Sequence, residues 1–231
     1  MRYSSEQLIK NFEESTKSGK LLYNAKEVNY TSKVTDKEDY CMNVLAKHLI
    51  DNIDRLTNIK EVYRKGSYNM NHTGQHSNKK SRRTEEIYAI NLFNGFDPNL
   101  GRFIDYQTPI KGTQSDNAGK IDLLLFNKDT LYLIELKVYD NKETLLRAVL
   151  EVYTYYKQIN HKKLIDDFKS KIGNNLVQSI NPSIMIFKGS RLEKQFQENK
   201  NKPLGDLINI LAIKIFIVDE NFTIKNIRPI N

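Results

Sequence analysis

The residues best suited to chemistry lie at the edges of two adjacent apolar stretches. In the segment GKIDLLLFNKDTLYLIELKVYD, which begins at Gly119, Asp122 opens the first stretch, and Glu135 and Lys137 close the second. Side chains two apart on a strand point to the same face, so Glu135 and Lys137 share a face while Leu136 between them points into the core. Unpaired charge is costly in strands as apolar as these, so the pattern indicates a site.

A short turn at the intervening NKD would pair the two strands as a hairpin and bring Asp122 beside Glu135 and Lys137. Two neighbouring carboxylates raise each other's pKa unless a cation lies between them. We therefore expect Mg²⁺, or Mn²⁺, which binds oxygen ligands and leaves room for a phosphate substrate. The lysine would orient or deprotonate the attacking water, or stabilise charge on the phosphate. The competing interpretation is a cross-strand ion pair on an exposed face.

The rest of the chain predicts the elements that must hold these residues. Helical spacing of apolar residues predicts helices within residues 5 to 62, in SSEQLIKNFEES and in TDKEDYCMNVLAKHLIDNIDRL, the second with Thr35 as its cap. The elements expected after residue 80 are a helix in SRRTEEIYAINLFNGF ending at Gly95, strands at GRFIDYQTPIK, GKIDLLLFN and TLYLIELKVYD, a helix of about five turns in NKETLLRAVLEVYTYYKQI, a strand at NPSIMIFKG, a helix at SRLEKQFQENK and a strand pair in LAIKIFIVDENFTIKNI.

This order of elements predicts an α/β fold. The long helix after the third strand lets the fourth strand return parallel to the third, which gives a mixed sheet covered by helices on both faces.

Composition narrows the class of protein. The 231 residues are 39% hydrophobic and 28% charged, which is typical of a globular protein. The single cysteine, Cys41, excludes an internal disulfide and a cysteine-based zinc site. The first residues lack the apolar core of a signal peptide and no run is long enough to span a membrane, so we expect a cytoplasmic protein. The net charge of +8 favours a polyanionic partner.

At its charged residues the sequence resembles the PD-(D/E)xK nuclease superfamily, whose signature is an acidic residue on one strand and E-x-K on the next. Asp122 matches the first acid, and ELK, from Glu135 to Lys137, matches the second half; Ile121 stands where the family's name has proline. The resemblance implies a restriction-endonuclease-like core of helix, three strands, helix and strand. It also implies that Asp122 and Glu135 bind the metal with help from the Leu136 carbonyl, and that Lys137 is the catalytic lysine.

Residues on the helix after the third strand extend the resemblance. Arg147, Glu151 and Tyr155 recur every four residues and form a polar stripe. The stripe resembles the Q-x-x-x-Y feature of the RecB-like branch, with Glu151 in place of the glutamine. The alternative is an ion pair between Arg147 and Glu151 within the helix.

The helix TEEIYAINLF resembles the first helix of the same fold, which often supplies one more acid to the metal site. Ala89 is small enough to mark the face packed on the sheet, and both Glu85 and Glu86 then fit geometrically; we prefer Glu86. Gln107 on the first strand is a further candidate, although the spacing leaves its face open.

A basic, polar stretch, RKGSYNMNHTGQHSNKKSRR, precedes that helix and is expected to be a solvated loop. His72 and His76 lack companion ligands, so no metal site is expected there. The organisation expected is a helical region at 1–65, this loop at 66–81 and a nuclease-like domain at 82–231. The basic residues that could contact a nucleic-acid backbone are Lys79, Lys80, Arg82, Arg83, Lys111, Lys120 and Lys188.

The sequence thus predicts a magnesium-dependent nuclease with DNA favoured over RNA, of the kind found in restriction, repair or phage defence. A homodimer is compatible with this prediction. Two alternatives stay open: a catalytically inactive nuclease-fold module that binds nucleic acid or a protein, and an RNA-cleaving enzyme. Retention of the aspartate, the glutamate and the lysine favours an active site.

Overall fold

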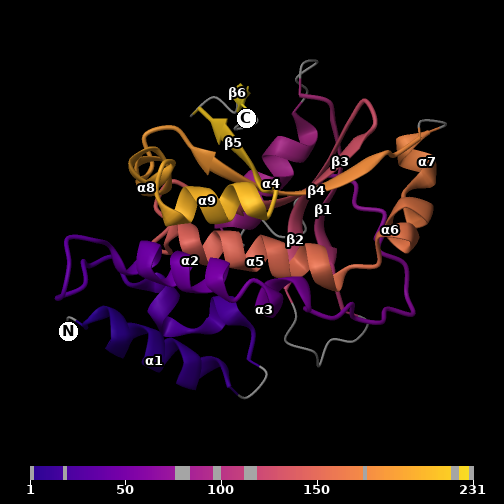
Figure 1. Cartoon of the computed structure of the whole chain (residues 1–231). Coiled ribbons are helices and arrows are strands. Elements are labelled where there is room, and N and C mark those ends of the chain that lie inside the picture. The colour runs from indigo at the N-terminus through magenta and orange to yellow at the C-terminus, as the bar shows by residue number, and fades with distance from the viewer. Residues whose placement is uncertain are drawn as a thin grey trace.

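A mixed β-sheet forms the centre of the protein (Figure 1). The computed structural model describes residues 3–17, 20–75, 84–95, 100–111, 119–173 and 176–219, and the backbone of 224–228. In this part of the chain six strands lie side by side in sequence order: β1 (Arg102–Pro109), β2 (Lys120–Asn127), β3 (Thr130–Lys137), β4 (Ser179–Phe187), β5 (Lys214–Val218) and β6 (Ile224–Arg228).

The strand directions confirm the expected mixed α/β sheet. β1, β2 and β3 are antiparallel, β4 pairs parallel with β3 and β5 parallel with β4, and β6 returns antiparallel to β5. The parallel step from β3 to β4 is possible because a helical connection carries the chain back across one face of the sheet.

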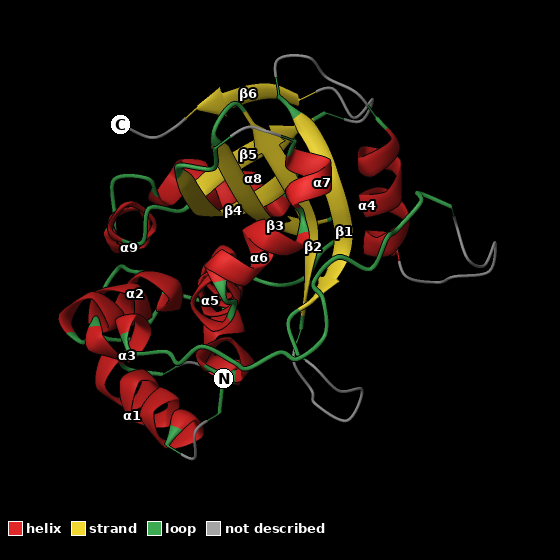
Figure 2. Ribbon diagram, turned by 90° about the vertical axis from the view of Figure 1, so that its right-hand side faces the viewer, coloured by secondary structure: helices red, strands yellow, loops and turns green. Residues whose placement is uncertain are grey.

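Helices cover both faces of this sheet (Figure 2). On one face α4 (Thr84–Asn94) packs Ala89 and Ile90 against β2 and its neighbours. On the other face α5 (Leu145–Gln158) lies between the sheet and the N-terminal helices. The Thr144 hydroxyl caps α5 by accepting a hydrogen bond from the Arg147 amide at 3.2 Å.

The remaining helices extend the α5 side of the molecule. Ser4 caps the first of them by accepting a hydrogen bond from the Gln7 amide. Their bounds are α1 (Ser5–Thr16), η1 (Leu22–Asn24), η2 (Lys26–Asn29), α2 (Cys41–Asp51), α3 (Asp54–Thr57), α6 (His161–Asp167), α7 (Lys169–Ile172), α8 (Arg191–Asn199) and α9 (Pro203–Ile210).

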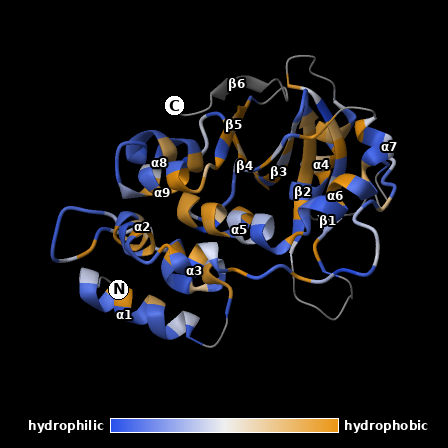
Figure 3. Ribbon diagram, turned by 45° about the vertical axis from the view of Figure 1, so that its right-hand side comes forward, coloured by the Kyte–Doolittle hydropathy of each residue, from blue (hydrophilic) through white to orange (hydrophobic). Residues whose placement is uncertain are grey.

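One apolar core joins the N-terminal helices to the sheet. Leu8 and Phe12 of α1 belong to the same buried cluster as Leu133 of β3 and Ile215 of β5. Figure 3 shows β2 hydrophobic along most of its length, as a strand buried on both faces should be. The N-terminal helices are therefore packed as part of the structure that carries the site.

Several expected boundaries are wrong. The second N-terminal helix begins at Cys41 and Tyr40 occupies its N-cap position, so Thr35 is not the cap. The Thr35 amide donates to the Tyr3 carbonyl. α5 is 14 residues long, about four turns rather than five, since its cap lies at Thr144. The short helices α6, α7 and α9 have no counterpart among the expected elements.

The basic stretch after α3 is only partly as expected. Residues 58–75 contain no helix or strand, but Tyr68 is fully buried and its amide donates to Asp167 at 2.8 Å. His72 lies within 2.9 Å of the buried Asp105 carboxylate and stacks on Tyr106. The described part of this stretch is therefore a mostly exposed loop, as expected, but one that is anchored by the buried Tyr68 and by His72. His76, Lys79, Lys80, Arg82 and Arg83 lie outside the described residues.

No helix in the described ranges is long and apolar enough to cross a membrane.

Candidate active site

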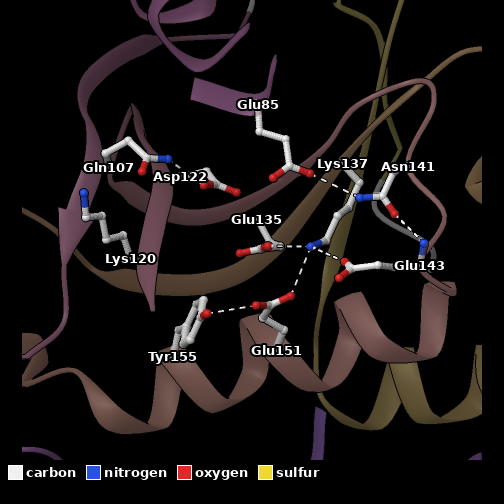
Figure 4. A pocket seen from close by; sticks show the side chains of 10 residues that line it. All are labelled: Glu85, Gln107, Lys120, Asp122, Glu135, Lys137, Asn141, Glu143, Glu151 and Tyr155. Carbon is white, nitrogen blue, oxygen red and sulfur yellow. Dashed lines mark hydrogen bonds and ion pairs between the residues drawn. The ribbon is translucent and has the colours of Figure 1, made fainter. Parts of the chain in front are cut away.

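The charged residues singled out in the sequence meet in one pocket at the end of the β2–β3 hairpin (Figure 4). Strands β1, β2 and β3, helices α4 and α5 and the loop before α5 all contribute side chains. The lining residues are Glu85, Gln107, Lys120, Asp122, Glu135, Lys137, Asn141, Glu143, Glu151 and Tyr155.

The pocket opens where β2 and β3 separate. Their regular pairing ends at Leu123 and Ile134, so continuing the register would place Asp122 opposite Glu135. Asp122 instead accepts a hydrogen bond through its own carboxylate from the Leu136 amide, at 2.9 Å. The side chain thus replaces a backbone acceptor, and the strands part at the residues that carry charge.

Lys137 lies at the centre of a ring of carboxylates. Its ammonium nitrogen contacts Glu135 at 2.8 Å, Glu143 at 2.7 Å and Glu151 at 3.0 Å. The lysine side chain is only 4% exposed, and an ammonium group has three hydrogens to donate. These three partners therefore satisfy a buried charge that would otherwise be costly.

Burial sets the protonation of the carboxylates of the hairpin. It raises the pKa of Asp122 to about 7, against the lowering effect of the Leu136 amide and the Lys137 charge. Burial also raises the pKa of Glu135 well above its ordinary value, and the nearby Asp122 charge adds to this rise. The raised pKa values mean that too little positive charge lies near these two buried acids to stabilise both in their ionised forms.

For Lys137, neighbouring charges affect the pKa more strongly than burial does. Burial by itself lowers the pKa of Lys137, but the charges of Glu135, Glu151 and Glu143 outweigh it and raise that pKa well above the ordinary value. Burial likewise raises the pKa of Glu143, but Lys137 and Arg147 reverse the effect and lower it. Lys137 is therefore a protonated, charged donor at neutral pH, which excludes it as a proton acceptor in this arrangement.

The helix that precedes the sheet contributes Glu85 to this pocket and Glu86 to an adjoining hollow. Glu85 lines the pocket, and its carboxylate accepts a hydrogen bond from the Asn141 side chain at 3.2 Å. Glu86 does not line this pocket, but it lines an adjoining hollow whose lining also includes Glu85, Gln107 and Asp122. The choice between the two acids depends on the exact start of α4, which the sequence does not fix.

Gln107 faces the pocket through an irregularity in β1. Its φ is 50°, a left-handed conformation that is rare for a residue with a side chain. The side-chain amide nitrogen of Gln107 donates to Asp122 Oδ1 at 2.8 Å, so the two carboxylate oxygens are held by different donors, Gln107 and Leu136. Unusual backbone conformations of this kind cluster at functional sites.

The polar stripe of α5 divides between two roles. Glu151 and Tyr155 line the pocket, and the tyrosine hydroxyl donates to the glutamate at 2.9 Å. The alternative ion pair between Arg147 and Glu151 is wrong, because Arg147 pairs with Glu143 at 2.7 Å and Glu151 pairs with Lys137. Arg147 is therefore linked to the site by its ion pair with Glu143.

The lysines that were expected to contact a nucleic-acid backbone do not all lie at the pocket. Lys120 lines the pocket at the start of β2, whereas Lys111 and Lys188 do not. The Lys111 carbonyl accepts a hydrogen bond from Arg64, and the Lys188 amide donates to the Val218 carbonyl.

Two residues of the site were not anticipated from the sequence: Glu143 and Asn141. Both lie in the loop between β3 and α5, whose polar residues look like those of any turn. Their only signal was proximity to the lysine in the chain.

The donor set is suited to a divalent cation. Five carboxylates and two lysines line the pocket, so negative charge is in excess. Glu135 contacts the lysine through Oε1, and each Asp122 oxygen accepts one hydrogen bond, so lone pairs remain for a metal. Within the described residues no three acidic, histidine or cysteine side chains are grouped as a ready-made metal cage. Magnesium does not need one, because one or two carboxylates, waters and a substrate phosphate complete its shell.

Comparisons with protein-family models, curated proteins and solved structures gave no match in any of the three.

Proposed function

We propose that this chain is a metal-dependent nuclease that hydrolyses phosphodiester bonds, with DNA as the favoured substrate, and that it adopts a restriction-endonuclease-like variant of the mixed α/β fold. The observation that carries the proposal is the pocket at the parted ends of β2 and β3, where buried Asp122 and Glu135 face the charged Lys137. The order α4, β1, β2, β3, α5 and β4, with the short helices α6 and α7 added before β4, supports the fold assignment.

Each side chain has a role in this proposal. Asp122 and Glu135 would hold Mg²⁺ or Mn²⁺, together with the Leu136 carbonyl, and Glu85 would add an acid from α4. When bound, the ion would supply positive charge to the phosphate and acidify the attacking water. Gln107 and the Leu136 amide keep the Asp122 carboxylate oriented toward the pocket.

Lys137 would act through charge. Its raised pKa keeps the ammonium group protonated, so it can stabilise negative charge that develops on the phosphate during attack by water. Three carboxylates lie within 3.0 Å of its nitrogen, so contact with a substrate requires one of them to yield. Glu135 is the partner best placed to do so, because it is also a proposed metal ligand.

The reaction is an in-line hydrolysis. Water forms a new P–O bond, one P–O ester bond breaks, and the water's protons end on the leaving oxygen and the bulk solvent. Lys120 at the mouth of the pocket would contact the nucleic-acid backbone. The net charge of +8 favours such a polyanion.

The second candidate is a module of the same fold that binds nucleic acid or a protein without turnover. The full engagement of Lys137 by three carboxylates favours it, because a lysine in that state can serve as a structural counter-ion alone. An RNA-cleaving enzyme is the third candidate, since the same residues would serve either backbone.

One assay separates the candidates. Purified protein is incubated with supercoiled plasmid, linear duplex, single-stranded DNA and RNA in Mg²⁺, Mn²⁺ or EDTA. Lys137→Ala is run in parallel, and Lys163→Ala is the control because Lys163 pairs with Asp167 outside the pocket. The proposal predicts cleavage of DNA that EDTA and Lys137→Ala abolish and Lys163→Ala retains.

Other outcomes assign the alternatives. Binding without cleavage in every metal would support the inactive module. Cleavage confined to RNA would support the third candidate.

A further inference from the structure

An extended segment after α3 runs along one side of the pocket. Residues 58–67, the strap, form neither helix nor strand, and Figure 2 shows this loop passing from the N-terminal helices toward the ends of β1 and β2. The Val62 amide donates to the carbonyl of Gln158, the last residue of α5, at 2.8 Å. The Arg64 guanidinium donates to the Lys111 carbonyl. The strap is therefore attached both to α5 and to the chain that follows β1.

These two attachments place the strap beside residues that line the pocket. Gln158 lies about one helical turn beyond Tyr155, which lines the pocket. Lys111 follows the end of β1, where Pro109 pairs with Lys120, another lining residue. The strap therefore borders the pocket on the side where α5 ends and β2 begins.

The strap turns an aromatic ring toward solvent. Tyr63 is 83% exposed, the largest fraction among the large hydrophobic side chains of the described residues. Its neighbours Val62 and Arg64 are half-buried and carry the two attachments, so the ring projects from a backbone that is held on both sides. A ring presented in this way offers a flat face on which an unpaired base can stack.

Lysines without ion-pair partners surround this ring. Lys60 and Lys65 are exposed on the strap, and Lys111 and Lys120 lie at its β1–β2 side. Within the described ranges none of these four lysines forms an ion pair with Glu61, the single acid of the strap, or with any other carboxylate. Uncompensated positive charge next to an exposed aromatic ring is the combination that binds a single-stranded nucleic acid.

We propose that the strap binds the single-stranded part of a nucleic-acid substrate, with Tyr63 stacked on an unpaired base and Lys60 and Lys65 in contact with phosphates. The favoured substrate is then single-stranded DNA, or DNA with an unpaired segment beside the cleaved bond, because a continuous duplex covers the faces of its bases. This inference rests on the proposed function for the cleavage that the strap would direct, and on the exposed surface of the strap for the binding itself.

Base-dependent binding tests the role of Tyr63. A fluorescently labelled strand of about 20 thymidines is titrated with protein in EDTA, beside an abasic strand of the same length. Tyr63→Ala should weaken binding of the thymidine strand by about tenfold, which is the usual contribution of one stacked base, and leave binding of the abasic strand unchanged within about twofold. Tyr63→Phe keeps the ring and should restore the affinity. Thermal unfolding should not change in either variant, because the side chain is exposed.

Tyr139→Ala is the matched control. Tyr139 is also an exposed tyrosine, but it belongs to the turn before α5, in which the Asn141 amide donates to the Val138 carbonyl at 3.0 Å. The strap lies at the other end of that helix, at Gln158, so Tyr139→Ala should leave binding of the thymidine strand unchanged within about twofold. A loss in Tyr139→Ala as large as the loss in Tyr63→Ala would overturn the inference.

The lysines should contribute through salt-dependent binding. Each phosphate contact with a single strand adds about 0.7 to the slope of log Kd against log salt concentration. Lys60→Ala combined with Lys65→Ala should therefore reduce this slope by about 1.4 for the thymidine and abasic strands alike. Lys33→Ala combined with Lys47→Ala is the control, since both of these lysines already have ion-pair partners, and it should leave the slope unchanged. The same slope in the strap variant and in the natural protein would contradict the phosphate contacts.

Binding in EDTA and cleavage in Mg²⁺ separate the two proposals. If the protein cleaves DNA but Tyr63→Ala binds the thymidine strand as tightly as the natural protein does, the inference about the strap fails alone. If no nucleic acid is cleaved in any metal but Tyr63→Ala shows the expected base-dependent loss, the strap binds a single strand and the nuclease proposal fails. A folded natural protein that binds neither strand would overturn the inference.

Discussion

The Lys137 ammonium group lies 3.0 Å from the Glu151 carboxylate, so the last residue of β3 is joined to the middle of α5. The contact brings together two charges that are only 4% and 11% exposed as side chains. A buried pair of this kind demands accurate placement of both partners, because each charge is costly without the other. The pocket is therefore a point at which stability and the proposed chemistry depend on the same groups.

Removing the lysine charge should destabilise the protein in a pH-dependent manner. Lys137→Met leaves Glu135, Glu143 and Glu151 crowded without their cation, and we expect a loss of about 3 kcal/mol in the free energy of unfolding at pH 7.5. The loss should shrink at pH 5, because unpaired buried carboxylates bind protons there. Urea unfolding at the two pH values measures the difference.

Lys163→Met provides the comparison for that experiment. Its pair with Asp167 lies outside the pocket and is partly exposed, so a change below about 1 kcal/mol is expected at both pH values. Equal losses in the two lysine variants would contradict a special role of the ring of carboxylates.

Asp122 should make the metal-free protein less stable as the pH rises. Its pKa is raised from 3.8 to about 7 by burial, so the folded state binds this proton more tightly than the unfolded state does. The resulting contribution to stability is complete below about pH 4 and is lost as the pH rises toward 7. Asp122→Asn cannot ionise, so in EDTA it should gain roughly 2–4 kcal/mol relative to the natural protein between pH 4.5 and pH 7.5.

Chemical unfolding of both proteins at the two pH values tests this expectation. Added Mg²⁺ should reduce the advantage of Asp122→Asn at pH 7.5, since a bound cation stabilises the ionised carboxylate. A stability difference that does not change with pH would show that Asp122 titrates normally.

Gly119 should be essential for the position of Tyr155. A Cβ atom added at residue 119 would lie 1.8 Å from the Tyr155 hydroxyl oxygen, far inside any allowed contact. Gly119→Ala should therefore displace the tyrosine, break its bond to Glu151 and lower the cleavage rate by about tenfold or more. Gly66→Ala is the control, because a Cβ there meets only the end of the Arg64 side chain at 3.8 Å. Full activity of Gly119→Ala would argue against any role of the Tyr155 hydroxyl.

Substitutions of Glu85 and Glu86 are expected to have different effects on the cleavage rate, although the two residues are neighbours on α4. Glu85→Gln changes a carboxylate that lines the pocket, so the cleavage rate should fall by about tenfold. Glu86→Gln changes one that does not, and its rate should stay within about twofold. Single-turnover kinetics at saturating Mg²⁺ measures both rates. The reverse order of effects would restore the choice of Glu86 made from the sequence.

The sequence predicted those parts of the site that follow a simple period. The two-residue alternation placed Glu135 and Lys137 on one face, and the turn-linked strands placed Asp122 near them. The four-residue spacing on α5 gave a polar stripe, and its resemblance to the Q-x-x-x-Y feature pointed to Glu151 and Tyr155, which line the pocket. The hairpin of β2 and β3 and the parallel return of β4 beside β3 followed from the alternation of strands and helices, because few connections are compatible with it.

The parts of the site that were missed depend on helix boundaries, local backbone conformation and loops, which leave no periodic pattern in the sequence. The start of α4 decides between Glu85 and Glu86, and a one-residue difference turns a side chain by about 100° around the helix. The left-handed conformation of Gln107 interrupts the alternation of β1. Glu143 and Asn141 belong to a loop.

Binding of Mn²⁺ tests the central claim most directly, because it asks whether the carboxylates of the parted hairpin hold a divalent cation at all. Calorimetric titration is carried out on the natural protein, on Asp122→Asn combined with Glu135→Gln, and on Asp105→Asn, which alters a buried aspartate outside the pocket. The account predicts saturable binding in the natural protein and in Asp105→Asn, and its loss in the double variant. Binding that survives the double variant unchanged, or is absent from a folded natural protein, would contradict the account.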